Sequence, residues 1–176
     1  VLQAAGYTVQ GGGKIFHNSF NDSPSWQTWF REPANPSPPG TPVNGLNAGH
    51  FDWGPLDVDD EAMGDHAVVS WGIRFLQRSH ERPFFLAVGL IRPHLPFYAP
   101  KKYFDLYPIE SVKRPKVLDS DLDDIPAAGL RIARPEGDHR KVVASDQWEK
   151  AVQAYLACIS FADAQIGRIV DVLAKS

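Results

Sequence analysis

Apolar residues recur at helical spacing in two stretches of the chain. The first stretch begins near Glu61, and its apolar stripe at i, i+3, i+4, i+7 and i+8 consists of Val68, Trp71, Gly72, Phe75 and Leu76. The second stretch covers residues 146–174, and its first four residues have the pattern of a capping box. The sequence therefore predicts two amphipathic helices, the second roughly 40 Å long at about 1.5 Å per residue.

Two other stretches have the composition of strands. Residues 7–10 are aromatic and β-branched, and three glycines follow at 11–13, where we expect the strand to end in a bend. Residues 84–91 (FFLAVGLI) are apolar without alternation, which is typical of a parallel strand covered on both faces. A helix, a break at Pro83 and a buried strand make half of a βαβ unit. The predicted fold class is therefore α/β, with a mainly parallel sheet flanked by helices.

Proline interrupts the rest of the chain. Residues 18–56 are rich in proline and glycine, and we expect one long ordered loop, attached to the body of the protein by its aromatic side chains. Residues 92–144 are also rich in proline, and we expect irregular structure there apart from one short helix near 100–107. Residues 1–6 resemble the last turn of a helix, and the chain stops directly after the second predicted helix, so we interpret it as an internal fragment of a longer protein.

Composition narrows the possible functions. The chain has 176 residues, 43% hydrophobic and 22% charged, which is an ordinary globular composition. A net charge of -3 without any long basic run gives no electrostatic basis for binding nucleic acid. No apolar run approaches the roughly 20 residues of a membrane span. The single cysteine, Cys158, excludes a disulfide framework within the chain and is expected to be a small core residue.

Candidate chemistry follows the two predicted strands, because ligands of open α/β sheets bind beyond the carboxyl ends of the strands. Lys14 and His17 follow the first strand, and His94 follows the second, between two prolines. Lysine supplies a compact positive charge and histidine can donate a proton near neutral pH, so the three would bind a small oxyanion if they meet on one rim. Each residue also has a non-functional interpretation. Lys14 would be an exposed lysine in a turn, His17 would cap a loop, and His94 would be a rigidly held loop residue.

Other motifs do not match a known site. A phosphate-binding loop is excluded, because Thr8 stands where its first glycine is needed and Ile15 where Ser or Thr is needed. Residues 119–124 lack the glycine and glutamate of a calcium-binding EF-hand loop, so we expect a solvated acidic turn. Asp163 lies among apolar residues of the second helix, and we expect it to make a buried hydrogen bond to a loop.

Four segments follow one another in a characteristic order: 13–17 (GKIFH), 82–97 (RPFFLAVGLIRPHLPF), 99–103 (APKKY) and 155–168 (YLACISFADAQIGR). In this order they resemble the sulfatase family and its iduronate-2-sulfatase-like branch. The resemblance implies an alkaline-phosphatase-like α/β sandwich, with residues 1–176 as an internal fragment of its catalytic domain. It also implies a sulfuric ester hydrolase with a formylglycine nucleophile, made from Cys or Ser in a C/S-x-P-x-R motif, and a divalent cation, usually calcium.

The resemblance assigns a role to each candidate residue. Lys14 would contact the formylglycine and a sulfate oxygen, His17 would orient or deprotonate the formylglycine hydroxyls, and His94 would contact the sulfate and assist the leaving alcohol. Cys158 is outside any C/S-x-P-x-R motif and the family's metal-binding aspartates are missing, so we expect the nucleophile and metal ligands to lie outside this chain. The isolated fragment is accordingly expected to be inactive.

The resemblance further implies a sulfated carbohydrate or a small sulfate ester as substrate, and a periplasmic, secreted or lysosomal location. Two alternatives stay open. A phosphatase or phosphodiesterase of the same superfamily would share the fold. A non-catalytic carbohydrate-binding fragment would use Trp26, Trp29 and Trp53 as sugar-stacking surfaces, with at least two of the rings exposed side by side.

Overall fold

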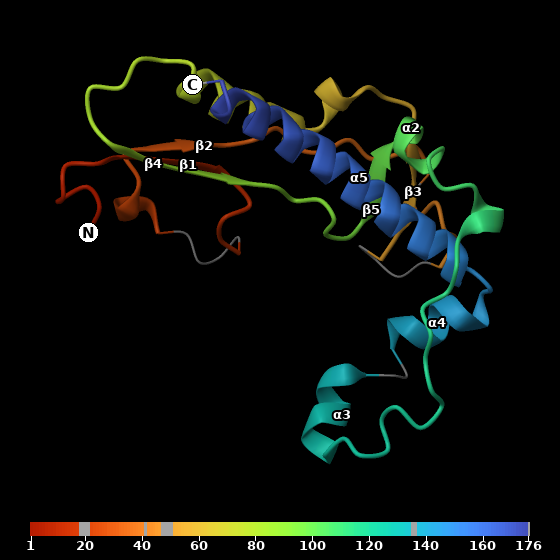
Figure 1. Ribbon diagram of the computed structural model, residues 1–176. Coiled ribbons are helices and arrows are strands. Elements are labelled where there is room, and N and C mark those ends of the chain that lie inside the picture. The colour runs from red at the N-terminus through yellow and green to blue at the C-terminus, as the bar shows by residue number, and fades with distance from the viewer. Residues whose placement is uncertain (18–21, 41, 47–50, 135–136, 176) are drawn as a thin grey trace.

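The computed structural model of the chain describes residues 1–17, 22–40, 42–46, 51–134 and 137–175. It is an α/β structure, which confirms the predicted class (Figure 1). The strands are β1 (Thr8–Gly13), β2 (Thr28–Phe30), β3 (Trp53–Leu56), β4 (Phe84–Gly89) and β5 (Phe97–Pro100). The α-helices are α1 (Gly64–Leu76), α2 (Lys101–Phe104), α3 (Ala127–Ala133), α4 (Asp138–Ala144) and α5 (Trp148–Leu173). Short 3-10 helices are η1 (Ser23–Ser25), η2 (Asp60–Ala62) and η3 (Ile109–Ser111).

The strands form two parallel sheets. The first has the order β2-β1-β4, with Thr8 opposite Phe84 and Gly13 opposite Gly89. The second consists of β3 and β5. Helix α1 lies between β1 and β4 in the chain and packs on both, so the predicted half unit is part of a complete βαβ crossover. The long helix α5 contacts α1 and extends to the β3-β5 sheet, whereas α3 lies apart from both sheets (Figure 1).

Strand β1 continues through its three glycines, so the predicted bend at 11–13 is wrong. A Cβ atom on Gly11 would lie 2.6 Å from the ring of Trp26, and one on Gly13 would lie 2.0 Å from the carbonyl oxygen of Gly89. Glycine is required here because an indole ring and the neighbouring strand approach the β1 backbone this closely. The Trp26 ring also packs on Phe85 of β4, so it attaches the segment after β1 to the sheet.

The core forms where the inner face of α5 meets the β3-β5 sheet. Ala154, Ala157, Cys158 and Phe161 are fully buried in one cluster that also contains Trp53. Complete burial of the Phe161 side chain contributes about 1.5–3 kcal/mol to folding. The prediction that Cys158 is a core residue is confirmed.

Asp163 is exposed, so its predicted buried hydrogen bond is wrong. Successive residues of a helix are separated by about 100°, so residues three or four positions apart share a face. Cys158, Phe161 and Gln165 therefore point into the core, whereas Asp163 lies on a different face. Gln165 is the buried polar residue of this part of the helix.

Residues 18–56 are not one long loop. Their described parts contain β2, which pairs with β1, and β3, which pairs with β5; residues 18–21, 41 and 47–50 lie outside the described residues. Residues 92–144 likewise contain β5, α2, α3 and α4 rather than a single short helix. The proline content suggested irregular structure, but prolines of this segment stand at the boundaries of regular elements. Pro100 ends β5 and precedes α2, and Pro126 directly precedes α3.

The predicted capping box at 146–149 is also wrong. Helix α5 begins at Trp148, and Gln147 at its N-cap makes no side-chain capping bond. Asp146 has a φ of 54°, and both it and Glu149 interact with the guanidinium group of Arg114. The two carboxylates of the predicted capping box therefore bind a cation of a distant segment, and neither Asp146 nor Glu149 is the N-cap residue.

Candidate functional site

The two strand ends selected from the sequence leave the sheet next to each other. Strands β1 and β4 are adjacent and parallel, and the amide of Lys14 donates a hydrogen bond to the carbonyl oxygen of Gly89 over 3.0 Å. The segment with Lys14 and His17 therefore starts at the same level of the sheet as the segment with His94. Lys14 is half-buried, and both histidines are exposed.

His94 is held by short local bonds in the loop between β4 and β5. Its amide donates to the carbonyl oxygen of Ile91 over 2.8 Å, and its Nδ1 lies 2.5 Å from the carbonyl oxygen of Leu95. Because a carbonyl oxygen only accepts, Nδ1 carries a proton in this arrangement. The other ring nitrogen, Nε2, is then the one that can exchange a proton with a ligand. The peptide bonds before Pro93 and Pro96 are cis.

Asp65 and Arg92, which sequence reasoning missed, lie beneath this loop and are almost completely buried. The Asp65 carboxylate, in the first turn of α1, accepts the amides of Ile91 over 2.8 Å and of Arg92 over 2.9 Å. The Arg92 guanidinium group donates to the carbonyl oxygens of Tyr98 over 2.6 Å and of His94 over 3.1 Å. The one sequence feature that could have indicated Arg92 is its position as a charged residue directly after the apolar run 84–91.

Burial shifts the pKa of both members of this pair. Burial raises the pKa of Asp65, and the amides of Ile91 and Arg92 only partly oppose it. Burial lowers the pKa of Arg92, against the opposing influence of Cys158 and Asp65. Each group counteracts the shift of the other, as expected for opposite charges that share a low-dielectric interior.

A second buried carboxylate anchors the start of the β3-β5 sheet. Asp52 accepts the amides of Val43 over 2.7 Å, Asn44 over 2.8 Å and Trp53 over 2.9 Å, and it also accepts the Tyr98 hydroxyl. Burial acts to raise the pKa of Asp52, but the four hydrogen bonds together hold it below its usual value. Tyr98 thus links the Asp52 anchor to the carbonyl oxygen that accepts from Arg92.

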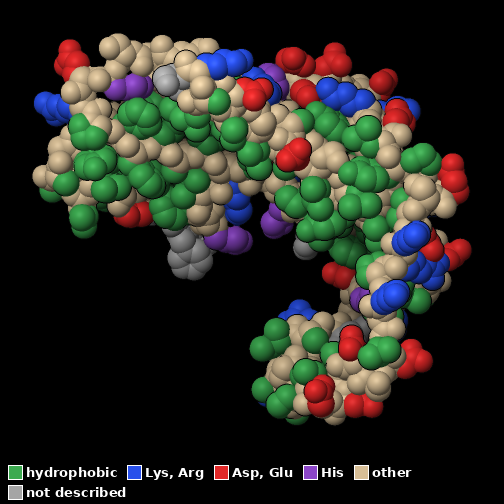
Figure 2. All heavy atoms as spheres, viewed as in Figure 1, with side chains coloured by type: hydrophobic (Ala, Val, Ile, Leu, Met, Phe, Trp, Pro, Cys, Tyr) green, Lys and Arg blue, Asp and Glu red, His purple; other side chains and the backbone are tan. Residues whose placement is uncertain are grey.

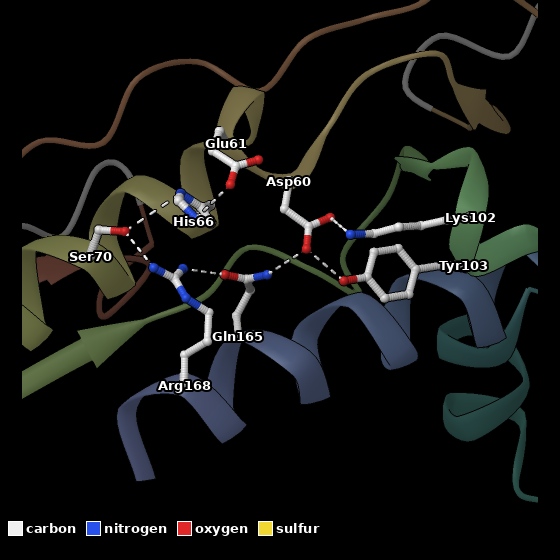
Figure 3. Close-up of polar contacts among 8 residues, drawn as sticks. All are labelled: Asp60, Glu61, His66, Ser70, Lys102, Tyr103, Gln165 and Arg168. Atoms are coloured by element: carbon white, nitrogen blue, oxygen red, sulfur yellow. Dashed lines mark hydrogen bonds and ion pairs between the residues drawn. The ribbon is translucent and has the colours of Figure 1, made fainter. Parts of the chain in front are cut away.

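A polar cluster joins α1, α2, α5 and η2 (Figure 3). The cluster consists of Asp60, Glu61, His66, Ser70, Lys102, Tyr103, Gln165 and Arg168. Arg168 donates to Gln165 over 2.7 Å and to Ser70 over 2.8 Å, and the Tyr103 hydroxyl donates to Asp60 over 2.8 Å. Asp60 also lies 2.9 Å from the Lys102 ammonium group. These bonds and ion pairs connect η2 and the helices α1, α2 and α5 to one another.

The three tryptophans do not form a common surface. Trp53 is only 4% exposed and belongs to the core. Trp26 and Trp29 are half-buried, with ring centroids 5.1 Å apart and an interplanar angle of 67°. Together with Ser23 and Arg31 they line a hollow of about 540 Å³. In Figure 2, apolar side chains gather over the part of the molecule that contains the β2-β1-β4 sheet.

The described part of the chain does not supply the cofactors that the resemblance implies. Within residues 1–17, 22–40, 42–46, 51–134 and 137–175, no three His, Cys, Asp or Glu side chains are arranged to hold a metal ion. Cys158 lies in the core, where burial raises the pKa of its thiol to about 12, and it does not fit a formylglycine precursor. No helix of the described ranges is both long and apolar enough to span a membrane.

Comparison with known proteins gives one consistent result. The family model described as "Sulfatase" matches residues 1–176. A "Sulfatase" of Formosa agariphila is 37% identical over 97% of the chain, and human "Iduronate 2-sulfatase" is 30% identical over 96% of it. An "Arylsulfatase" of Clostridium perfringens is 30% identical over 84% of the chain. The chain spans about a third of the length of these relatives, namely 36%, 35% and 30%.

Proposed function

Because the chain belongs to the sulfatase family, we propose that the polypeptide containing it hydrolyses sulfuric esters and that Lys14, His17 and His94 form part of its sulfate site. The observation that carries this proposal is the bond between the Lys14 amide and the Gly89 carbonyl oxygen. Through that bond, the segments bearing the three residues start from one edge of a parallel sheet, where ligands of such sheets bind.

The residue types fit the charge changes of ester hydrolysis. As the bond between sulfur and the ester oxygen breaks, the alcohol oxygen gains negative charge and needs a proton. A protonated His94 can donate it from Nε2, since Nδ1 is engaged by Leu95. The Lys14 ammonium group stabilises negative charge on the sulfate oxygens. His17 orients or deprotonates the nucleophile in this scheme.

The finer parts of the proposal come from the family. We infer an iduronate-2-sulfatase-like enzyme acting on a sulfated carbohydrate or a small sulfate ester, in a periplasmic, secreted or lysosomal location. We infer that its formylglycine and its divalent cation, expected to be calcium, come from residues outside this chain. In support, no three His, Cys, Asp or Glu side chains of the described residues could hold a metal ion, and the buried Cys158 does not fit a formylglycine precursor.

The test compares phenyl sulfate with phenyl phosphate in the full-length polypeptide that contains this chain, because unsubstituted phenol is a poor leaving group whose departure depends on a proton donor. His94→Gln is expected to lower kcat/KM for the sulfate by ~10²–10⁴, the usual contribution of a general acid. Lys14→Met is expected to lower it by ~10²–10³, because a charge partner of the developing anion is lost. His139→Gln and Lys116→Met serve as matched controls, because both side chains are exposed and lie outside the proposed site.

Two outcomes would overturn the proposal. Faster hydrolysis of the phosphate than of the sulfate would assign the polypeptide to the phosphatase alternative. Equal losses in the His94→Gln and His139→Gln variants would show that His94 takes no part in the reaction.

A further inference from the structure

The loop that carries His94 is fixed from below by two buried charges. Asp65 is fully buried and Arg92 is 4% exposed, although charged groups are rarely placed in a protein interior. Asp65 accepts the two consecutive amides at the end of the β4 segment, those of Ile91 and Arg92. These bonds hold the point where the chain leaves the sheet.

Arg92 holds the loop at two further points. Its Nη1 donates to the carbonyl oxygen of His94 and its Nε to that of Tyr98, so one planar guanidinium group bridges the middle of the loop and the start of β5. Tyr98 is itself bonded to the buried Asp52. The backbone of His94 is therefore connected through Arg92 to a carboxylate anchored in the core.

We propose that Arg92, supported by Asp65, is a positioning residue for the His94 imidazole. The bond from Arg92 fixes the carbonyl group of His94, and the adjacent Leu95 carbonyl oxygen in turn fixes Nδ1 of the same histidine. With Nδ1 protonated and bonded, Nε2 is held in one orientation. The guanidinium geometry matters, because two carbonyl oxygens are reached by two differently placed N–H groups of one rigid fork.

An alternative role is stability alone. Buried charged pairs often contribute little net stability, and apolar residues can replace them. A purely structural Arg92 would affect the amount of folded protein and its melting temperature. It would leave the tautomer of the His94 ring and the chemical step of the folded protein unchanged.

The test uses the full-length polypeptide with ¹⁵N-labelled histidine and the variant Arg92→Lys, which keeps the charge but lacks the fork. Long-range ¹H–¹⁵N spectra are expected to show the Nδ1–H form of His94 in the parent protein and a mixture of both tautomers in the variant. With phenyl sulfate, kcat is expected to fall at least ~10-fold while KM changes less than ~2-fold, because a misplaced proton donor affects the chemical step more than binding. Arg168→Lys is the matched control, since this guanidinium group donates to Gln165 of α5 and Ser70 of α1 and not to a carbonyl oxygen of the loop.

The expected change in kcat rests on the proposed function of His94, whereas the expected change in the His94 tautomer does not. The spectra therefore distinguish failure of this inference from failure of the proposed function. An unchanged tautomer and unchanged kcat in Arg92→Lys, alongside a large loss in His94→Gln, would overturn the role of Arg92 and leave the proposed function intact. Loss of the Nδ1–H form without any effect of His94→Gln on turnover would instead overturn the proposed function. If Arg92→Lys does not fold, Arg92→Gln replaces it, because its neutral, shorter side chain cannot reach both carbonyl oxygens.

Discussion

Gly13 and Gly89 face each other across β1 and β4 with no room for a side chain between them. Gly13 has a φ of 74°, and a Cβ atom there would lie 2.0 Å from the Gly89 carbonyl oxygen. This oxygen also accepts the Lys14 amide, so the contact controls where the proposed sulfate-binding segment begins.

Gly13→Ala is therefore expected to destabilise the protein by more than ~4 kcal/mol, the range of severe steric lesions. Gly40→Ala is the matched control, because Gly40 has the same φ of 74° but a Cβ atom added to it would meet no other atom within 4 Å. That variant should lose only the ~1–2 kcal/mol of a left-handed residue with a side chain. Urea unfolding of both variants measures the difference, and equal losses would show that backbone conformation alone is responsible.

Tyr98→Phe is expected to lower the free energy of unfolding, and the loss should be largest at neutral pH. The variant removes one hydrogen bond to the buried Asp52 carboxylate, a loss of about 1.5–3 kcal/mol for a bond to a charged group. The pKa of Asp52 is lowered in the folded state, so its bonds stabilise the protein above the usual aspartate pKa of about 4 and are lost as the pH falls through the lower folded value.

The difference in unfolding free energy between parent and Tyr98→Phe should therefore shrink as the pH falls below about 4. Tyr155→Phe, at a ring that is 43% exposed, is the control and should leave stability unchanged at every pH. A constant difference for Tyr98→Phe from neutral pH to the acid limit would contradict the link to Asp52.

His66 is expected to make the protein less stable in mild acid. Burial and then the nearby Arg168 lower the pKa of His66, and Glu61, which is 75% exposed at 3.9 Å, does not offset them. The unfolded chain then binds a proton near about pH 6.5 before the folded protein does, so stability falls as the pH drops below that value. His66→Gln should flatten this dependence in melting curves recorded from neutral to mildly acidic pH, whereas His139→Gln, at an exposed histidine, should not.

The sequence is most informative where structure depends on neighbours along the chain. The stripe around Val68 and the apolar run from Phe84 predict α1 and the parallel strand β4, because periodicity and composition act locally. The predicted burial of β4 on both faces is wrong, since β4 lies at the edge of its sheet and Phe85 is 42% exposed. The start of α5 is mispredicted because Arg114, more than thirty residues away, takes the carboxylates of Asp146 and Glu149. The glycines of β1 suggest a bend because the rings that approach them belong to a later segment.

The same limit applies to the candidate site. Lys14, His17 and His94 are selected because each follows a predicted strand, and the structure brings their segments to one sheet edge. Asp65 and Arg92 are not selected as site residues by any motif. Their importance comes from hydrogen bonds between residues 26 and 27 positions apart, which no local pattern encodes.

Because Cys158 of α5 is completely buried, its reactivity can report local unfolding of that helix. With a pKa of about 12 and no exposed surface, the thiol is protected from alkylating reagents while α5 stays docked. As the only sulfhydryl in the sequence, its labelling kinetics would record a single event, the separation of α5 from the second sheet.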